Sequence, residues 1–263
     1  MNRLPWAMLG ALVLTQICYP LTAGSVRAAL TVLTVVLGCL LSVWHAFHTR
    51  GRRAGLALVG IATAGGFAVE AIGVATGFPF GAYDYSGQLG PKVLGVPVII
   101  PLAWTWMAWP AWLAALRLIP IGAQSKGATA RTGRIAVAAV GLAAWDLFLD
   151  PQMVAEGYWR WLDPTPALPG VPGVPIGNYV GWLGFALLVM TAMSLAPGTS
   201  AEPSTGSDLP MIVLWFWTYA SSVLAHAVFL DLPASAAWGG VVMGAVVVPL
   251  ADRSARRPAR VPT

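Results

Sequence analysis

Residues 55–76 read GLALVGIATAGGFAVEAIGVAT, an apolar run with one charged side chain, Glu70. A helix of about 20 apolar residues crosses the hydrocarbon core of a bilayer, so this run predicts a transmembrane helix. A carboxylate facing lipid is energetically costly, and such a residue usually faces the protein interior and marks a site. The run therefore predicts both a fold class and a candidate functional residue.

The rest of the chain repeats this pattern. The sequence is 57% hydrophobic and only 10% charged, which indicates a polytopic membrane protein. Eight apolar runs are long enough to cross a bilayer, at residues 4–22, 26–47, 55–76, 98–119, 134–150, 177–196, 209–230 and 232–250. The last two runs are nearly continuous, so seven or eight spans are predicted. We expect one all-α membrane domain over residues 1–252 and a basic, disordered cytoplasmic tail at 253–263.

The distribution of basic residues predicts the orientation. If eight spans start with a cytoplasmic N-terminus, the C-terminus is also cytoplasmic, and twelve Lys and Arg residues lie inside with three outside. Those inside are Arg3, Arg50, Arg52, Arg53, Arg117, Lys126, Arg131, Arg134, Arg253, Arg256, Arg257 and Arg260, and those outside are Arg27, Lys92 and Arg160. This split follows the positive-inside rule. The net charge of +5 is thus a feature of membrane topology, and we expect a cell-membrane protein that binds no nucleic acid.

Two further acids lie in residues 140–151, VGLAAWDLFLDP. Asp146 and Asp150 are four residues apart and share one helix face. At 1.5 Å per residue, Glu70 is expected about 9 Å and Asp146 about 6 Å below the outer ends of their helices. An alternative is that Asp150-Pro151 simply ends the helix. The agreement in depth predicts that all three acids lie in the outer part of the membrane.

Two long outer loops, 77–97 and 151–176, are rich in Gly, Pro and aromatic residues. They predict a packed cap above the acids, and the alternative is an interfacial aromatic belt. Residues 95–104, GVPVIIPLAW, also match residues 173–182, GVPIGNYVGW, and each segment follows an acid-bearing helix and an aromatic loop. We therefore expect spans 3–4 and 5–6 to form a parallel repeat whose acids face one cavity.

Carboxyl groups and aromatic rings limit the possible chemistry. The two cysteines are isolated, and no spacing typical of a metal site is present, so no metal is expected. Paired carboxyls can divide the roles of acid and base, and aromatic faces stabilise a cation. This set suits protonation of an alkene and capture of the cation by water. His226 is expected to be a packing histidine, and His45 and His48 are expected at the surface.

Four segments carry a resemblance to a known family, at residues 70–85 (EAIGVATGFPFGAYDY), 145–154 (WDLFLDPQMV), 159–161 (WRW) and 174–182 (VPIGNYVGW). In these segments the chain resembles the CruF-type carotenoid 1,2-hydratases, which include the bisanhydrobacterioruberin and γ-carotene hydratases. The resemblance implies addition of water to the terminal C1=C2 double bond of an acyclic carotenoid ψ-end, without a cofactor. The product is a tertiary alcohol, in C50 bacterioruberin-type or related carotenoid biosynthesis.

We assign roles to ten residues on this basis. Glu70 or Asp146 would protonate C2, and Asp150 with Asn178 would orient and deprotonate the water. The residues expected to bind substrate are Phe80, Tyr83, Tyr85, Trp104, Trp145, Asn178 and Trp182. The expected partners are the carotenoid within the bilayer, lipid, and other enzymes of carotenoid biosynthesis.

Two other classes of function stay open. The spacing of Asp146 and Asp150 superficially resembles the aspartates that bind magnesium diphosphate, which would suit a membrane prenyltransferase or a cyclase of the same pathway. Buried acids and a repeat also occur in proton-coupled transporters, and a non-enzymatic carotenoid-binding protein is a related alternative. A transporter would need a polar path to the cytoplasmic side.

Overall fold

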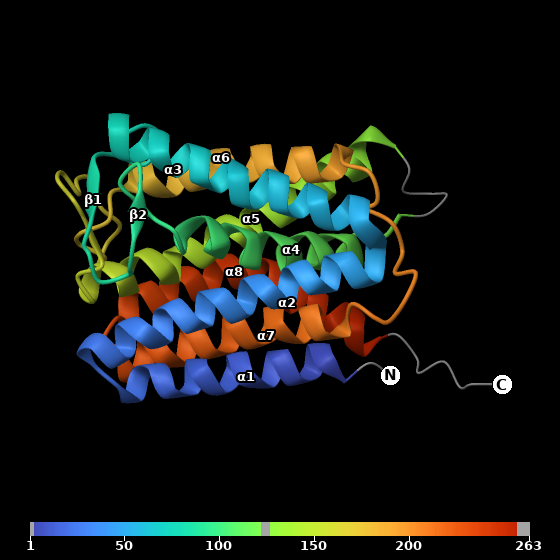
Figure 1. Ribbon diagram of the computed structural model, residues 1–263, viewed down its shortest axis with the longest axis horizontal. Coiled ribbons are helices and arrows are strands. Elements are labelled where there is room, and N and C mark those ends of the chain that lie inside the picture. Colours follow the sequence, from blue (N-terminus) through green and yellow to red (C-terminus); the bar gives the residue numbers. More distant parts are fainter. Residues whose placement is uncertain (1–2, 122–126, 257–263) are drawn as a thin grey trace.

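The computed structural model describes residues 3–121 and 127–256, which form a bundle of long helices (Figure 1). The helices are α1 (Leu4–Cys18), α2 (Gly24–Leu58), α3 (Gly65–Thr76), α4 (Ile100–Leu118), α5 (Ala128–Ala155), α6 (Ile176–Leu195), α7 (Leu209–Leu224) and α8 (Pro233–Ala255). A 3-10 turn (Tyr19–Leu21) follows α1, and π-helical turns join α2 to α3 (Val59–Ala64) and extend α7 (Ala225–Phe229). The predicted all-α helical bundle is confirmed.

Six of the described helical segments are long and apolar enough to cross a membrane. One of them, Gly24–Thr76, is a double pass because the chain reverses at Gly51, whose φ of 81° suits glycine. Figure 1 shows the chain turning back there from α2 toward α3. Helix α4 adds another pass that is less apolar because it carries four tryptophans. The described chain thus crosses the bundle eight times, and α1 begins at the end where α8 finishes (Figure 1).

Helix α4 lies in the interior of the bundle and packs against α2, α5 and α7. Trp104, Trp109 and Trp112 are almost completely buried on it. A helix that is apolar on all sides is typical of one surrounded by protein. Its bulk fills the centre of the bundle.

Two helices contain an internal proline whose lost hydrogen bond is replaced by a neighbour. Proline has no N–H and leaves the carbonyl four residues earlier without its helical partner. For Pro110 this carbonyl is that of Trp106, which accepts from Ser42 Oγ of α2 at 2.9 Å. For Pro151 it is that of Leu147, which accepts from Ser235 Oγ of α8 at 2.6 Å. Both helices therefore continue past proline inside the bundle.

The two outer loops pair with each other at the opposite end of the bundle from the start of α1 (Figure 1). Strand β1 (Tyr83–Tyr85) pairs antiparallel with β4 (Trp159–Trp161), with Tyr83 opposite Trp161 and Tyr85 opposite Trp159. A shorter hairpin joins β2 (Lys92–Val93) to β3 (Val96–Pro97). Because side chains alternate along a strand, the aromatic rings point inward while Asp84 and Arg160 lie exposed. The predicted packed cap is confirmed.

Three expectations about element ends and exposure are wrong. Helix α5 runs through Pro151 to Ala155, so the Asp150-Pro151 pair does not end it, and Asp146 lies about 13 Å from its outer end rather than 6 Å. Helix α8 continues to Ala255, so the first residues of the predicted tail are helical, and residues 257–263 lie outside the described part. His45 is buried, since Trp109 Nε1 donates to its Nδ1 at 3.0 Å and its Nε2 lies 3.1 Å from the Ser207 carbonyl.

Candidate active site

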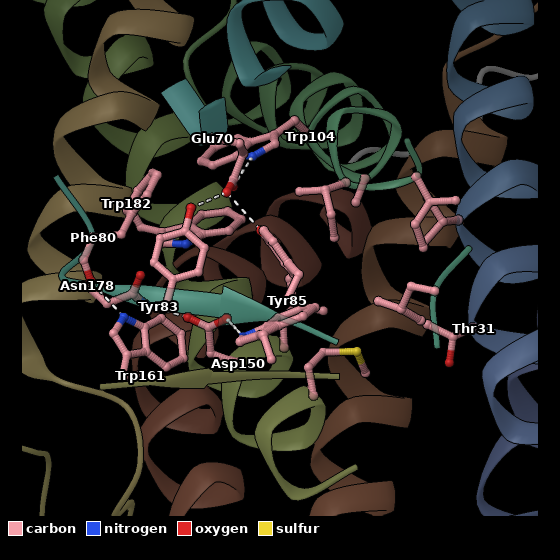
Figure 2. A pocket seen from close by; sticks show the side chains of 18 residues that line it. Thr31, Glu70, Phe80, Tyr83, Tyr85, Trp104, Asp150, Trp161, Asn178 and Trp182 are labelled. Carbon is pink, nitrogen blue, oxygen red and sulfur yellow. Dashed lines mark hydrogen bonds between the residues drawn. The ribbon is translucent and has the colours of Figure 1, made fainter. Parts of the chain in front are cut away.

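A cavity of about 50 Å³ lies beneath the cap, where it meets the helices (Figure 2). By the volume that one buried water needs, it has room for a few water molecules. Its lining comes from α2, α3, α4, α5, α6 and both outer loops. The lining residues are Thr31, Val35, Glu70, Phe80, Tyr83, Tyr85, Leu89, Ile99, Ile100, Ala103, Trp104, Leu149, Asp150, Met153, Trp159, Trp161, Asn178 and Trp182. It is an aromatic chamber with two acids and no Lys or Arg.

Glu70 of α3 is held by three donors on its two oxygens. Tyr83 and Tyr85 donate their hydroxyls to Oε2 at 2.6 and 2.8 Å, and Trp104 donates Nε1–H to Oε1 at 3.1 Å. Burial, and then the charge of Glu70, raises the pKa of both phenols well above its ordinary value, so both retain their protons. Figure 2 shows the three donors converging on the carboxyl group from the cap strand and α4. Three donors with no acceptor suit an ionised carboxylate.

Asp146 and Asp150 of α5 form a second acidic group. The amide nitrogen of Asn178 donates to Asp146 Oδ2 at 2.8 Å and also to Asp150 Oδ2. Two carboxyl oxygens therefore lie within hydrogen-bonding reach of one nitrogen. The other oxygen of Asp150 accepts from Trp159 Nε1 at 3.1 Å. Asp146 is completely buried, and its Oδ1 has no hydrogen-bond partner within residues 3–121 and 127–256.

Aromatic rings pack around these acids. Trp104 and Trp182 stack with ring centroids 3.9 Å apart and an interplanar angle of 16°. These tryptophans end the two matching segments, 95–104 and 173–182, so their contact brings the ends of the segments together, while the repeat itself stays a prediction. Tyr83 meets Tyr85 edge to face at 5.4 Å, and Phe80 meets Tyr83 in the same way at 6.3 Å. Aromatic rings therefore border the cavity from several directions.

Eight of the ten predicted site residues line this cavity, namely Glu70, Phe80, Tyr83, Tyr85, Trp104, Asp150, Asn178 and Trp182. Asp146 lies one hydrogen bond behind the cavity wall, through Asn178. Trp145 does not line it, and the prediction that it does is wrong. Trp145 lines a neighbouring cavity and packs edge to face on Trp182 at 6.3 Å. It precedes Asp146 by one residue, which turns it about 100° away around the helix.

Glu70 and Asp150 share the cavity without meeting directly. No hydrogen bond joins Glu70 to Asp146 or Asp150 in the described parts of the chain, and Figure 2 shows Glu70 and Asp150 on opposite sides of the two tyrosine rings. Within residues 3–121 and 127–256, no group of three or more His, Cys, Asp or Glu side chains lies close enough together to hold a metal ion.

Two cap residues in this site were not predicted. Trp159 bonds Asp150, and Trp161 donates Nε1–H to the Phe80 carbonyl at 2.8 Å. Both tryptophans come from the segment WRW at residues 159–161. This segment alternates aromatic and charged residues, as does Tyr83-Asp84-Tyr85 opposite it, and that shared alternation is the sequence pattern that could have identified them. His226 is a packing histidine as predicted, with Nδ1 2.9 Å from Ser235 Oγ and Nε2 3.1 Å from Gln152 Oε1.

Comparisons with known proteins agree with this arrangement. The model of a family described as carotenoid biosynthesis protein matches residues 30–247. A bisanhydrobacterioruberin hydratase of Haloarcula japonica is 38% identical over 133 residues, which cover 50% of this chain and 42% of that protein. The chain thus matches less than half the length of this relative. No solved structure matches it. Because the family model covers most of the sequence, this multi-pass membrane protein belongs to the carotenoid biosynthesis protein family.

Proposed function

We propose that the protein is a carotenoid hydratase that adds water to the terminal C1=C2 double bond of an acyclic carotenoid ψ-end. The observation that carries the proposal is the cavity, which places Glu70 and Asp150 among aromatic rings at the capped end of the bundle. The relative from Haloarcula japonica, named a bisanhydrobacterioruberin hydratase, supports this reaction class. A C50 carotenoid of the bacterioruberin type is the substrate we favour.

The first step is protonation of C2 by the aspartate pair. Two buried carboxylates that share one donor repel each other when both are ionised, so the pair holds one proton, as in other carboxyl dyads. Asp150 lines the cavity and Asp146 lies behind it, so Asp150 is the group that reaches the alkene. The pair then stays without its proton until the water that attacks C1 returns one to it. The geometry favours this pair as the acid over Glu70, whose oxygens already accept three hydrogen bonds.

Protonation at C2 leaves a tertiary cation at C1. The faces of Tyr83, Tyr85, Trp104 and Trp182 surround the position where it would form. Aromatic faces attract a cation, and the effect is stronger when water is excluded. An ionised Glu70 in the same cavity adds a compensating negative charge.

Water completes the reaction at C1. Its oxygen forms the new C–O bond, and the proton that it loses returns to the aspartate pair that was deprotonated in the first step, either directly or by way of Glu70. The sum is alkene plus water giving a tertiary alcohol, with no change of oxidation state in the protein. Asn178, which bonds both aspartates, holds the pair in position and leaves its amide oxygen available to orient the water.

The polyene would approach from the membrane. A surface groove along α2 is lined by Ala28, Ala29, Val32, Leu33 and Val36, with Ser25 and the loop residues Gln88 and Gly90. Leu89, between these loop residues, lines the site cavity instead. We place the long chain in this groove, with its end group reaching the acids past Leu89. The substrate then stays in the bilayer, and neighbouring pathway enzymes could exchange it there.

A prenyltransferase or cyclase of the same pathway is the second enzymatic candidate. Diphosphate recognition needs cations or basic side chains, and the cavity lining contains neither Lys nor Arg. Transport through the bundle is less well supported, because Trp104, Trp109 and Trp112 fill α4 between the cavity and the opposite end.

Product analysis tests the proposal. The full chain, purified into lipid nanodiscs, is incubated with an acyclic ψ-ended carotenoid in the presence of a magnesium chelator. A hydratase yields a product heavier by one water per modified end, and the chelator has no effect. A reaction that needs Mg²⁺ and releases diphosphate, or a substrate that binds and is recovered unchanged, would replace this proposal with one of the alternatives.

A further inference from the structure

A second cavity of about 110 Å³ lies beside the first. It is lined by residues of α1, α2, α4, α5 and α7 and of the turns that follow α1 and α7, on the side of the bundle away from Glu70. Its lining residues are Gln16, Tyr19, Pro20, Thr31, Thr34, Val35, Trp106, Trp145, Phe148, Leu149, Gln152, Met153, Thr218, Ser221, Ser222, Ala225 and Leu230. By the volume that one buried water needs, it has room for several water molecules.

Four buried polar atoms on this lining have no protein partner. They are Tyr19 Oη, Thr34 Oγ1, Trp106 Nε1 and Thr218 Oγ1, and no hydrogen bond to them is present within residues 3–121 and 127–256. These residues are 7%, 9%, 3% and 1% exposed. A buried donor or acceptor without a partner costs about 1–3 kcal/mol, so four around one cavity point to a polar occupant. Since Trp106 offers only a donor and the hydroxyl groups offer both roles, water satisfies all four.

The two cavities share a wall. Thr31, Val35, Leu149 and Met153 line both of them, and Leu149 directly precedes Asp150 in α5. Thr31 is the only polar residue among the four. Its Oγ1 donates to the Arg27 carbonyl at 2.9 Å and keeps its lone pairs for a donor such as water. Met153 has a flexible side chain that adapts readily.

We propose that the second cavity is a buried water chamber that supplies the water consumed at the site, with Thr31 as the polar residue through which water passes. The inference rests on the proposed hydratase function. Each turnover removes one water from a chamber closed by aromatic rings and surrounded by lipid. A store beside the cavity replaces it without opening the cap, which keeps bulk water away from the cation until C–O bond formation.

Three matched variants separate this role from a structural one. Thr31→Val keeps the shape and removes the hydroxyl, and Thr31→Ser restores it. Thr15→Val makes the same change at a buried threonine that lines neither cavity and bonds only the Ala11 carbonyl of its own helix. We expect turnover of Thr31→Val to fall roughly tenfold, with the KM for carotenoid unchanged, and Thr31→Ser and Thr15→Val to stay near wild type. Equal turnover in Thr31→Val and wild type overturns the role of Thr31.

A structure of the wild-type protein at a resolution that shows ordered water tests the chamber without any assay. We expect waters bonded to Thr34 Oγ1, Trp106 Nε1 and Thr218 Oγ1. A dry chamber, or one filled by a lipid tail, overturns the proposal even if the enzyme is active. If ordered waters are present but wild-type protein forms no alcohol, the hydratase function fails and the supply role fails with it, while the hydrated cavity stands as a separate result.

Discussion

Each acid of the site is held by side chains that come from another segment of the chain. Glu70 of α3 bonds Tyr83, Tyr85 and Trp104, and the aspartates of α5 bond Asn178 of α6 and Trp159 of the cap. These partners are aromatic or amide donors that carry no charge. Because none of these partners is a Lys or Arg, no ion pair with them keeps the carboxyl groups permanently ionised. The carboxyl groups can therefore both donate and accept protons.

Replacing an acid by its amide tests its role in the reaction. We expect Asp150→Asn and Glu70→Gln each to lower turnover by at least roughly a hundredfold, because general acid–base groups contribute factors of that size. Turnover is measured by product mass in nanodiscs. Asp84→Asn is the control, since Asp84 lies exposed on the outer face of the same cap. Retained turnover in both site variants, with normal folding, would remove the carboxyl groups from the mechanism.

The two tyrosines predict the alkaline limb of the pH profile. Burial raises the pKa of Tyr83 and Tyr85 well above its ordinary value, so both phenols stay protonated and continue to donate to Glu70 at a pH where a free tyrosine ionises. We expect no loss of activity from these groups up to about pH 10, the pKa of an unperturbed phenol. Activity is followed in wild type and Tyr85→Phe. A wild-type decline near pH 9 that Tyr85→Phe abolishes would contradict this view.

Serine side chains from neighbouring helices allow a proline to lie inside a helix of the bundle. Ser42 Oγ donates to the Trp106 carbonyl that Pro110 leaves without a partner. We expect Ser42→Ala to lower the free energy of unfolding by about 1–3 kcal/mol, because a buried carbonyl then has no donor. Thermal denaturation in detergent measures the change. Ser194→Ala removes a half-buried serine hydroxyl from α6 whose hydrogen bond to the Thr191 carbonyl is exposed, so it should leave the melting temperature unchanged, and equal effects would contradict the explanation.

The close contact between α6 and the cap depends on a glycine, Gly181, which has no side chain. A Cβ at Gly181 would lie 2.6 Å from the Pro79 carbonyl oxygen and 3.0 Å from Phe80, whereas one at Gly184 meets nothing within 4 Å. We expect Gly181→Ala to lower both stability and turnover, by about 1–3 kcal/mol of unfolding free energy for an overpacked contact. Gly184→Ala on the same helix is the matched control. If the two variants have the same melting temperature, the close approach at Gly181 is not essential.

The helices could be predicted from the sequence more completely than the contacts between segments. Apolar length predicts the helices, and the i, i+4 spacing places Asp146 and Asp150 on one face. Trp159 was missed because its bond to Asp150 depends on the register of β1 with β4, in which Trp159 pairs with Tyr85, 74 residues earlier in the chain. His45 was placed at the surface because the Ser207 segment that covers it lies far away in sequence. Burial of a residue by distant segments leaves no local pattern.

For the whole molecule, eight passes place both described ends of the chain at one end of the bundle (Figure 1). Together with the basic residues, this predicts a cytoplasmic N-terminus and C-terminus and an extracytoplasmic cap. The test labels intact cells with a membrane-impermeant thiol reagent, in a background with Cys18 and Cys39 replaced by serine. Gly87→Cys in the cap should react, and Ala201→Cys in the 197–208 segment should react only after lysis. The reverse pattern would invert the topology.

Labelling with heavy oxygen tests whether the carboxyl groups of this site add water to a carotenoid end group. Wild type, Glu70→Gln, Asp146→Asn and Asp150→Asn are each incubated with a ψ-ended carotenoid in heavy-oxygen water, and the mass of the product is then measured. We predict one heavy oxygen per hydrated end in wild type and little or none in the three variants. An unlabelled or unchanged carotenoid from folded wild-type protein, or full labelling in all three variants, would contradict the account.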